Sequence, residues 1–301
     1  MEHARTRAFV EVTAAVLVWG ASFAATKVAL RQVSPVTVVW LRFAMGIMVL
    51  GAAAAWRGEL RRVSARDLGI FAGLGLIGIT LHQWLQSTAL QTTHASTGGW
   101  VAAATPVCIA LVAALVLRER LTSLQWVGIV VATLGVALIV TDGAPAMLLA
   151  GRFAEPGDLL MVLSAPNWAV FSVLSRRVLR DHPPARMIFY TMTMGWLMTS
   201  VLFVAAGKPA EVGQLTSTGW LAVGFLGIFC SGLAYIFWYD ALHSAPASQV
   251  GTFLYLEPLV AVATGMVFQG ERLLVSSIVG GAVILAGVWL VNREPLADAS
   301  P

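Results

Sequence analysis

The chain has 301 residues, of which 58% are hydrophobic and only 11% are charged, and its mean hydropathy is +0.81. A soluble domain carries about 25% charged residues, so this composition excludes an ordinary water-soluble protein. The net charge of +4 does not indicate a nucleic-acid partner, because most Lys and Arg residues stand in short clusters between apolar stretches, where they orient a chain in a lipid bilayer. Cys108 and Cys230 lie inside apolar stretches and indicate neither a disulfide framework nor a metal site.

Ten apolar stretches are long enough to cross a membrane, since a helix needs about 20 mainly apolar residues to span the hydrocarbon core. In chain order they cover residues 9–31, 36–56, 68–90, 95–117, 124–141, 157–180, 185–206, 218–241, 246–269 and 274–292. The start of the chain has the outline of a signal peptide, but nine similar segments follow it, so we interpret it as a retained first span. The sequence therefore predicts an all-α integral membrane protein with ten transmembrane helices.

The second half of the chain repeats the first. A motif recurs at a constant spacing of 152 positions (258 − 106 = 152), and the pairs are Pro106 with Pro258, Glu119 with Glu271, Arg120 with Arg272, Leu121 with Leu273, Gly128 with Gly280 and Gly135 with Gly287. Further upstream, Trp19 and Pro35 recur as Trp168 and Pro184 at a spacing of 149. The chain is therefore a tandem duplication, which we divide into a first repeat, residues 9–141, and a second repeat, residues 157–292.

The distribution of basic residues predicts the orientation. With the N-terminus inside, 13 Lys and Arg residues fall in inner segments and 4 in outer ones, so both termini are expected in the cytoplasm. Five spans per repeat is an odd number, and the second repeat must cross the bilayer in the opposite sense. Two inverted five-helix repeats are the architecture of many secondary transporters, which hold their substrate near the midplane between the repeats.

The same residues resemble the drug/metabolite transporter superfamily, and within it the EamA-type ten-span exporters. The resemblance is carried by residues 19–23 (Trp-Gly-Ala-Ser-Phe) with Lys27, by the Ala-Leu and Ala-Ser pairs at 89–90 and 95–96, and by the duplicated motif. It implies a bacterial-type inner membrane, a central cavity lined by spans 1, 3, 4, 6, 8 and 9, and export of amino acids, other metabolites or lipophilic cations. The second repeat departs from the pattern at Ala169, which stands where the first has Gly20.

Helical spacing selects one face of each span that could line such a cavity. The substrate-binding candidates on these faces are Trp19, Lys27, His82, Gln86, Trp100, Trp168, Tyr235, Tyr239, Thr252 and Tyr255. Aromatic residues near span ends also form interfacial belts, which is the alternative interpretation for a tryptophan or tyrosine. His82 could relay protons, or it could be a neutral core residue bonded to Gln86.

Three kinds of residue inside the spans indicate mechanism. Glu257 is a carboxylate near the middle of span 9 and, like His82, is a candidate for proton coupling. Pro106 and Pro258 interrupt helices in mid-membrane and are candidate hinges. Lys27 and Arg42 lie near outer ends, where snorkelling would bring their charges to the membrane surface.

We therefore predict an inner-membrane exporter of amino acids, aromatic or hydrophobic ones in particular, that works by alternating access. The alternative is efflux of lipophilic quaternary ammonium drugs, which aromatic faces suit through cation–π attraction. A membrane-embedded enzyme is disfavoured because the five histidines, at 3, 82, 94, 182 and 243, are scattered; we expect no cofactor and no metal. The glycine pairs of spans 5 and 10 predict close helix contacts, internal or in a homodimer.

Overall fold

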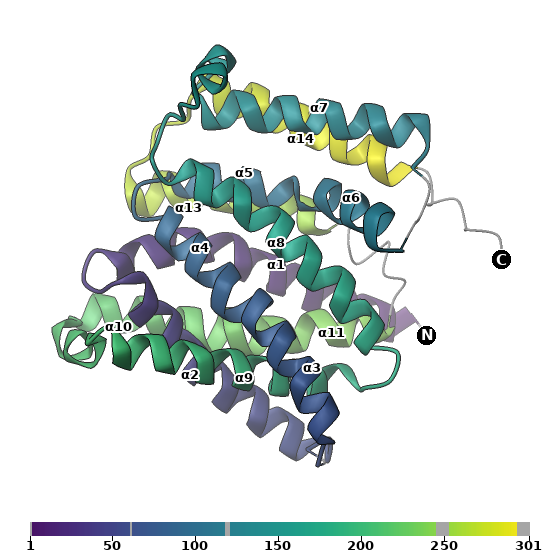
Figure 1. The fold of residues 1–301 in the computed structure, drawn as a ribbon, viewed down its shortest axis with the longest axis vertical. Coiled ribbons are helices and arrows are strands. Elements are labelled where there is room, and N and C mark those ends of the chain that lie inside the picture. Colours follow the sequence, from purple (N-terminus) through teal and green to yellow (C-terminus); the bar gives the residue numbers. More distant parts are fainter. Residues whose placement is uncertain (1, 61, 118–120, 245–252, 294–301) are drawn as a thin grey trace.

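The computed structural model describes residues 2–60, 62–117, 121–244 and 253–293, which form an all-helical bundle (Figure 1). The first repeat contains α1 (Glu2–Leu30), α2 (Pro35–Trp56), α3 (Ala65–Gly75), η1 (Leu76–Leu81), α4 (His82–Ala89), α5 (Ala95–Ala103), α6 (Thr105–Leu117) and α7 (Ser123–Val140). The second contains α8 (Asp158–Val178), α9 (Pro184–Ala205), α10 (Ser217–Gly224), η4 (Phe225–Leu233), α11 (Ala234–Ser244), η5 (Phe253–Leu256), α13 (Glu257–Gln269) and α14 (Val275–Arg293). Short 3₁₀ helices, η2 (Pro145–Ala150) and η3 (Lys208–Gln214), lie in two connections.

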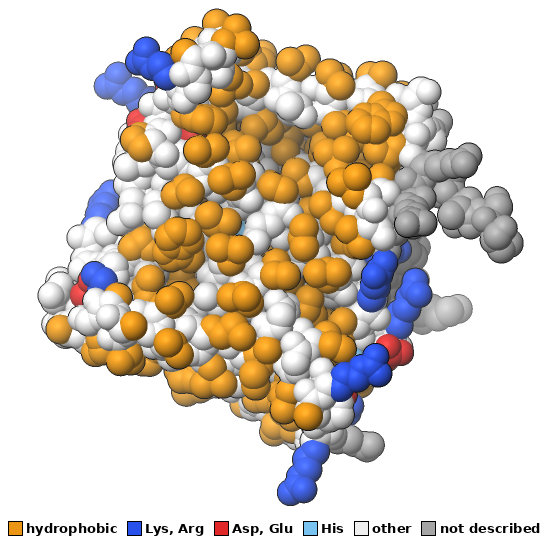
Figure 2. Space-filling view, in the orientation of Figure 1, with side chains coloured by type: hydrophobic (Ala, Val, Ile, Leu, Met, Phe, Trp, Pro, Cys, Tyr) orange, Lys and Arg blue, Asp and Glu red, His pale blue; other side chains and the backbone are white. Residues whose placement is uncertain are grey.

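The predicted membrane architecture is confirmed. Within the described ranges, nine helical segments are apolar and long enough to cross a bilayer, and η5 with α13 forms a shorter apolar segment, 253–269, at the place of the remaining span. Figure 2 shows hydrophobic side chains covering the middle of one face of the bundle, with Lys and Arg gathered towards its ends. The two ends of the described chain lie at the same end of the bundle (Figure 1).

Local sequence signals explain where several helices begin. Pro35 and Pro184 stand at the first positions of α2 and α9, where the missing N–H of proline costs nothing. Ser64 and Thr122 cap α3 and α7 through capping boxes, in which the cap side chain bonds the backbone N–H three residues on and that residue bonds back. These caps fix the residues at which the two helices start.

Each repeat packs mainly on the other. α1 lies against α11 and α13, and the equivalent helix of the second repeat, α8, lies against α4 and α6. α2 packs on η4, which we call the first junction; α9 packs on α3 and η1, which we call the second junction. The contacts thus follow the two-fold relation between the repeats.

The two junctions have the same close backbone approach. Gly46 of α2 lies against Ser231, where an added Cβ would be 2.7 Å from the serine Cβ. Gly195 of α9 lies against Ile79, where an added Cβ would be 2.5 Å from the isoleucine Cβ. The glycines are 149 positions apart and their neighbours are 152 apart, so the duplication has preserved both contacts.

Spans 3 and 8 contain π-helical segments that the sequence analysis did not predict. The spacing of 152 places residues 76–81 of η1 onto residues 228–233 of η4, so the two segments are equivalent. A π-helical turn holds more residues than an α-helical one, and such turns are frequent at functional sites. The extra residue rotates the part of the helix that follows it. Side chains after the π-helical turn therefore point in a different direction from the one that an uninterrupted α-helix would give them.

The glycine pairs of α7 and α14 face each other inside the molecule. An added Cβ on Gly128 would lie 2.7 Å from the carbonyl oxygen of Gly287, and one on Gly135 would lie 2.7 Å from that of Gly280. The two helices form one edge of the bundle (Figure 1). Of the two contacts predicted for these glycines, the structure contains the internal one. A homodimer through spans 5 and 10 stays a prediction and would use their outward faces, which expose Trp126 and Trp289.

Candidate functional site

Aromatic side chains from both repeats gather where α1, α4, α8 and α11 meet; we call Trp19, His82, Trp168, Tyr235, Trp238 and Tyr239 the aromatic band. The Trp19 ring lies edge-on to Tyr235, with centroids 5.4 Å apart, and 5.3 Å from Trp238. The His82 ring lies 4.8 Å from Trp168. Trp19, Trp168 and Tyr239 all pack on the core cluster that contains Tyr235. Five predicted site residues are therefore part of one band.

Hydrogen bonds fix the orientation of two of these rings. Trp19 Nε1 donates to the carbonyl oxygen of Cys230 at 3.1 Å, so a first-repeat side chain is tied to the second repeat. His82 Nδ1 lies 3.2 Å from the carbonyl oxygen of Ser164, to which it donates. The interpretation of His82 as a partner of Gln86 is wrong, because its ring turns towards α8 after the π-helical segment; Gln86 lies one turn further on, half-buried.

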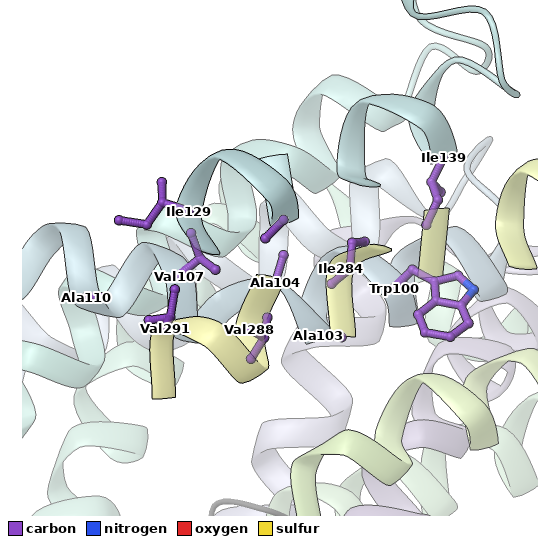
Figure 3. Close-up of a cluster of buried hydrophobic side chains, with 11 residues drawn as sticks. Trp100, Ala103, Ala104, Val107, Ala110, Ile129, Ile139, Ile284, Val288 and Val291 are labelled. Carbon is purple, nitrogen blue, oxygen red and sulfur yellow. The ribbon is translucent and has the colours of Figure 1, made fainter. Parts of the chain in front are cut away.

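Trp100 belongs to a different cluster, beside α7 and α14 (Figure 3). Tyr255 packs against the same cluster. Trp100 is 6% exposed, and an added Cβ on Gly281 of α14 would lie 2.5 Å from its ring. Tyr255 Oη accepts a hydrogen bond from Asn292 Nδ2 at 2.9 Å. Both side chains thus face spans 5 and 10. Thr252 lies outside the described residues, as do Glu119 and Arg120 of the duplicated motif.

Lys27 lies in the last turn of α1, and no described carboxylate is at ion-pair distance from it. Its Nζ donates to the carbonyl oxygen of Thr93 at 2.5 Å, just before α5 begins. The charge is thus partly satisfied by the backbone of its own repeat. Lys27 stays a predicted substrate contact, at the C-terminal end of α1 rather than in the aromatic band.

Glu271 joins the repeats at this end. Its carboxylate accepts the backbone N–H groups of Ala95 at 2.5 Å and Ser96 at 3.0 Å, and His94 Nδ1 lies 3.7 Å away. Burial alone would raise the pKa of Glu271, but the hydrogen bonds from His94, Ser96 and Ala95 hold it at about 2. The same contact raises the pKa of His94. The second copy of the duplicated motif therefore caps α5, a helix of the first repeat.

A second carboxylate, that of Glu211 in the second repeat, holds the start of α2 in a similar way. It accepts the backbone N–H of Ser34 at 2.8 Å and the hydroxyl of Thr37 at 2.6 Å, and Lys208 Nζ lies 2.7 Å away. Burial would raise its pKa, yet Lys208, Thr37 and Ser34 lower it to about 2. Carboxylates of the second repeat thus accept hydrogen bonds at the N-terminal ends of two helices of the first repeat, α5 and α2.

Both mid-membrane prolines stand at helix breaks. Span 4 divides at Ala104 into α5 and α6, with Pro106 in the first turn of α6. Span 9 changes from 3₁₀ to α-helix between Leu256 and Glu257, with Pro258 in the first turn of α13. Discontinuous helices at this depth are typical of transporter binding sites, because they present free backbone groups. Glu257, half-buried, is the first residue of α13; bending at either break stays a prediction.

Arg42 is the residue whose position the sequence analysis missed. The snorkelling interpretation is wrong, because Arg42 is 5% exposed and its side chain lies at the first junction. Nε donates to Ser231 Oγ and Nη1 to Gln83 Oε1, each at 3.0 Å. Both partners are neutral, and a charge at mid-depth costs on the order of 3 kcal/mol. Ser231 stands in a π-helical segment and Gln83 just after one. Because the sequence alone does not reveal these segments, it does not show that the two side chains turn towards Arg42.

The described residues contain no group of three or more His, Cys, Asp or Glu side chains arranged to hold a metal ion. The features that remain are an apolar multi-pass bundle, two repeats that pack on each other, and polar and aromatic side chains gathered between them. This combination defines the class of membrane transport proteins built from repeats.

The model of the EamA-like transporter family matches residues 8–141 and again residues 155–293. The chain therefore belongs to this family. It is 26% identical to the uncharacterized transporter YyaM of Bacillus subtilis over 270 residues, which cover 89% of this chain and 88% of that one. It is 27% identical to a protein of Streptantibioticus cattleyicolor named "Probable terminal-alkyne amino-acid exporter" over 281 residues, 93% of this chain and 92% of that one. A solved crystal structure with 23% identity superimposes with a TM-score of 0.66 over 97% of this chain and 99% of the other, which shows a common fold.

Proposed function

We propose that the protein exports amino acids with aromatic or hydrophobic side chains, or closely related metabolites, by alternating access. The observation that carries the proposal is the aromatic band, because both repeats of a transporter-family bundle contribute rings to it. Aromatic faces bury large apolar side chains with favourable ring geometry. The similarity to a protein named as an amino-acid exporter supports the same substrate class.

In this proposal the substrate binds between the repeats, and the breaks at Pro106 and Pro258 bend as the bundle opens to one side or the other. Glu257 exchanges a proton during the cycle and couples export to the proton gradient. The protein lies in a bacterial-type inner membrane with both termini in the cytoplasm, which is the side that receives most of the Lys and Arg residues.

The transport proposal is tested with purified protein in liposomes. Labelled L-phenylalanine placed outside should enter with saturable kinetics, and unlabelled L-tryptophan and L-leucine should compete. Trp19→Ala and Trp168→Ala should raise the half-saturating concentration at least several-fold, because each removes one ring of the band. Trp126→Ala, on the outward face of α7, is the matched control. Absence of saturable flux with every amino acid would contradict the substrate class.

The coupling role of Glu257 has a separate readout. With an imposed pH gradient, wild-type flux should increase, and Glu257→Gln should retain exchange of substrate for substrate while losing the response to the gradient. Glu155→Gln removes a carboxylate from the connection between α7 and α8 and serves as the control. A normal gradient response in Glu257→Gln would remove this residue from the mechanism.

Efflux of lipophilic quaternary ammonium ions is the competing function, since cations also bind aromatic faces. The positive charge of Arg42, near Tyr235 of the band, weighs against it. Tetrabutylammonium competing with labelled L-phenylalanine at micromolar concentration, or being transported itself, would favour this alternative.

A further inference from the structure

Arg42 carries a buried positive charge that the protein itself does not neutralise. No described Asp or Glu side chain lies within ion-pair distance of it. Of its five N–H groups, one bonds Ser231 and one bonds Gln83, and the others have no N, O or S acceptor within the described ranges. The guanidinium carbon also lies 5.2 Å from the centroid of the Phe43 ring, a contact that leaves the charge unpaired. A buried guanidinium with spare donors is a strong recognition element for an anion, because the low dielectric strengthens the attraction.

The surroundings place this charge beside the aromatic band. Cys230 and His82 stand directly before Ser231 and Gln83, the two hydrogen-bond partners of Arg42, and Tyr235 packs in the same core cluster as Phe43. Cys230 provides the carbonyl to which Trp19 donates. An anion bound at Arg42 would therefore have the rings of Trp19 and Tyr235 nearby, which fits a substrate with a negative head and an apolar side chain.

The second junction shows that the packing does not require an arginine. The position equivalent to Arg42 is Thr191 (191 − 42 = 149), which is fully buried. The residue equivalent to Ser231 is Ile79, and the one equivalent to Gln83 is Tyr235. The same helix approach is thus achieved there without a charge. The cation at the first junction has a role other than holding the helices together.

We propose that Arg42 binds the carboxylate of the transported substrate, with Ser231 and Gln83 orienting the guanidinium. This inference rests on the proposed function and specifies how its substrate class is recognised. The planar guanidinium can donate two parallel hydrogen bonds to one carboxylate, which a lysine cannot. Gln83 belongs to the first repeat and Ser231 to the second, so the guanidinium is oriented by both halves of the molecule.

The test compares ligands that differ only at the head group. Purified protein in nanodiscs is titrated with L-phenylalanine, L-phenylalaninamide and 3-phenylpropionate, and ligand-induced thermal stabilisation gives each affinity. The wild-type protein should bind the acid at least about tenfold more tightly than the amide, because a charge-assisted hydrogen bond is lost. Equal affinity for acid and amide in the wild-type protein overturns the inference, whatever the variants do.

Variants of Arg42 test whether this residue causes the preference for the acid over the amide. Arg42→Gln should bring the ratio of acid to amide affinity close to one. Arg42→Lys should give an intermediate ratio, because lysine keeps the positive charge but cannot donate two parallel hydrogen bonds to one carboxylate. Arg152→Gln makes the same change in net charge at an exposed position and should keep the full ratio. A merely structural Arg42 would lower the melting temperature of the variants without changing the ratio, which would overturn the inference.

The 3-phenylpropionate titration separates failure of this inference from failure of the proposed function. If this acid binds in an Arg42-dependent way and no amino acid binds, the Arg42 inference stands and the amino-acid substrate class is wrong. If amino acids bind but Arg42→Gln keeps the preference for the acid, the transport proposal stands and the inference is wrong. If neither the amino acids nor 3-phenylpropionate bind, both are wrong.

Discussion

The first and second junctions share one backbone arrangement but carry different side chains. At each, a glycine lets two helices from opposite repeats come into contact, at positions that the duplication relates. At the first, the buried polar group is a charged arginine with two side-chain partners; at the second, it is Thr191, whose hydroxyl has no hydrogen-bond partner in the described part of the chain. The duplicated packing was retained while the side chains at the equivalent positions 42 and 191 diverged. Steric changes should therefore affect both junctions, whereas loss of the buried charge should affect only the first.

The largest effect should come from adding a methyl group where backbones meet. Gly75→Ala at the second junction and Gly227→Ala at the first should each lower the free energy of unfolding by about 1–3 kcal/mol through overpacking. An added Cβ would lie 2.6 Å from the Gly195 nitrogen in the first case and 2.6 Å from the Met45 Cβ in the second. Thermal denaturation in detergent measures both effects.

Two nearby glycines supply the controls for this experiment. Gly73 in α3 and Gly224 in α10 have nothing within 4 Å of an added Cβ. Their alanine variants should be neutral or slightly stabilising, because alanine is the better helix former. A loss of stability at only one of Gly75 and Gly227 would break the equivalence of the two junctions.

An intermediate effect is expected at Glu271 and Glu211, the two carboxylates that join the repeats by capping helices. Glu271→Gln should lower stability at pH 7 by about 1 kcal/mol, since it weakens the cap on α5. The folded-state pKa of Glu271 is about 2, below its ordinary value of 4.5, so its contribution is complete above pH 5 and lost as the pH falls towards 2. Melting temperatures of wild type and variant should therefore converge as the pH falls from about 5 towards 2. Parallel curves over that range would contradict the assignment, and Glu211→Gln should behave in the same way.

The smallest effect on stability is expected at Thr191, the residue of the second junction that is equivalent to Arg42. Thr191→Val removes a buried hydroxyl that lacks a partner, so it should leave stability unchanged or raise it by up to about 1 kcal/mol. Thr199→Val, in the same helix, removes a hydroxyl that donates to the Gly195 carbonyl at 3.0 Å and should be destabilising. Neither should alter the ratio of acid to amide affinity, which belongs to the first junction alone. A clear loss of stability in Thr191→Val would show that this hydroxyl has a partner after all.

The spans, their approximate limits and the close contacts of spans 5 and 10 could be predicted from the sequence, because they depend on hydropathy, breakers and glycine spacing. The helix breaks at Pro106 and Pro258 could also be predicted, because proline interrupts the backbone hydrogen bonds of a helix. The partner of His82 could not be predicted, because π-helical turns change the phase of the helix and leave no mark in composition. The depth of Arg42 was missed because its partners, Gln83 and Ser231, come from distant parts of the chain.

The glycine contacts between α7 and α14 have a mechanical consequence. Where carbonyl oxygens of one helix lie against glycines of its neighbour, sliding by even one residue brings a side chain into the gap. We therefore expect α7 and α14 to move together as one rigid unit to which both repeats contribute. In the proposed transport cycle we expect this edge to stay fixed while the other spans open, and a mutation that loosens it to uncouple the two halves.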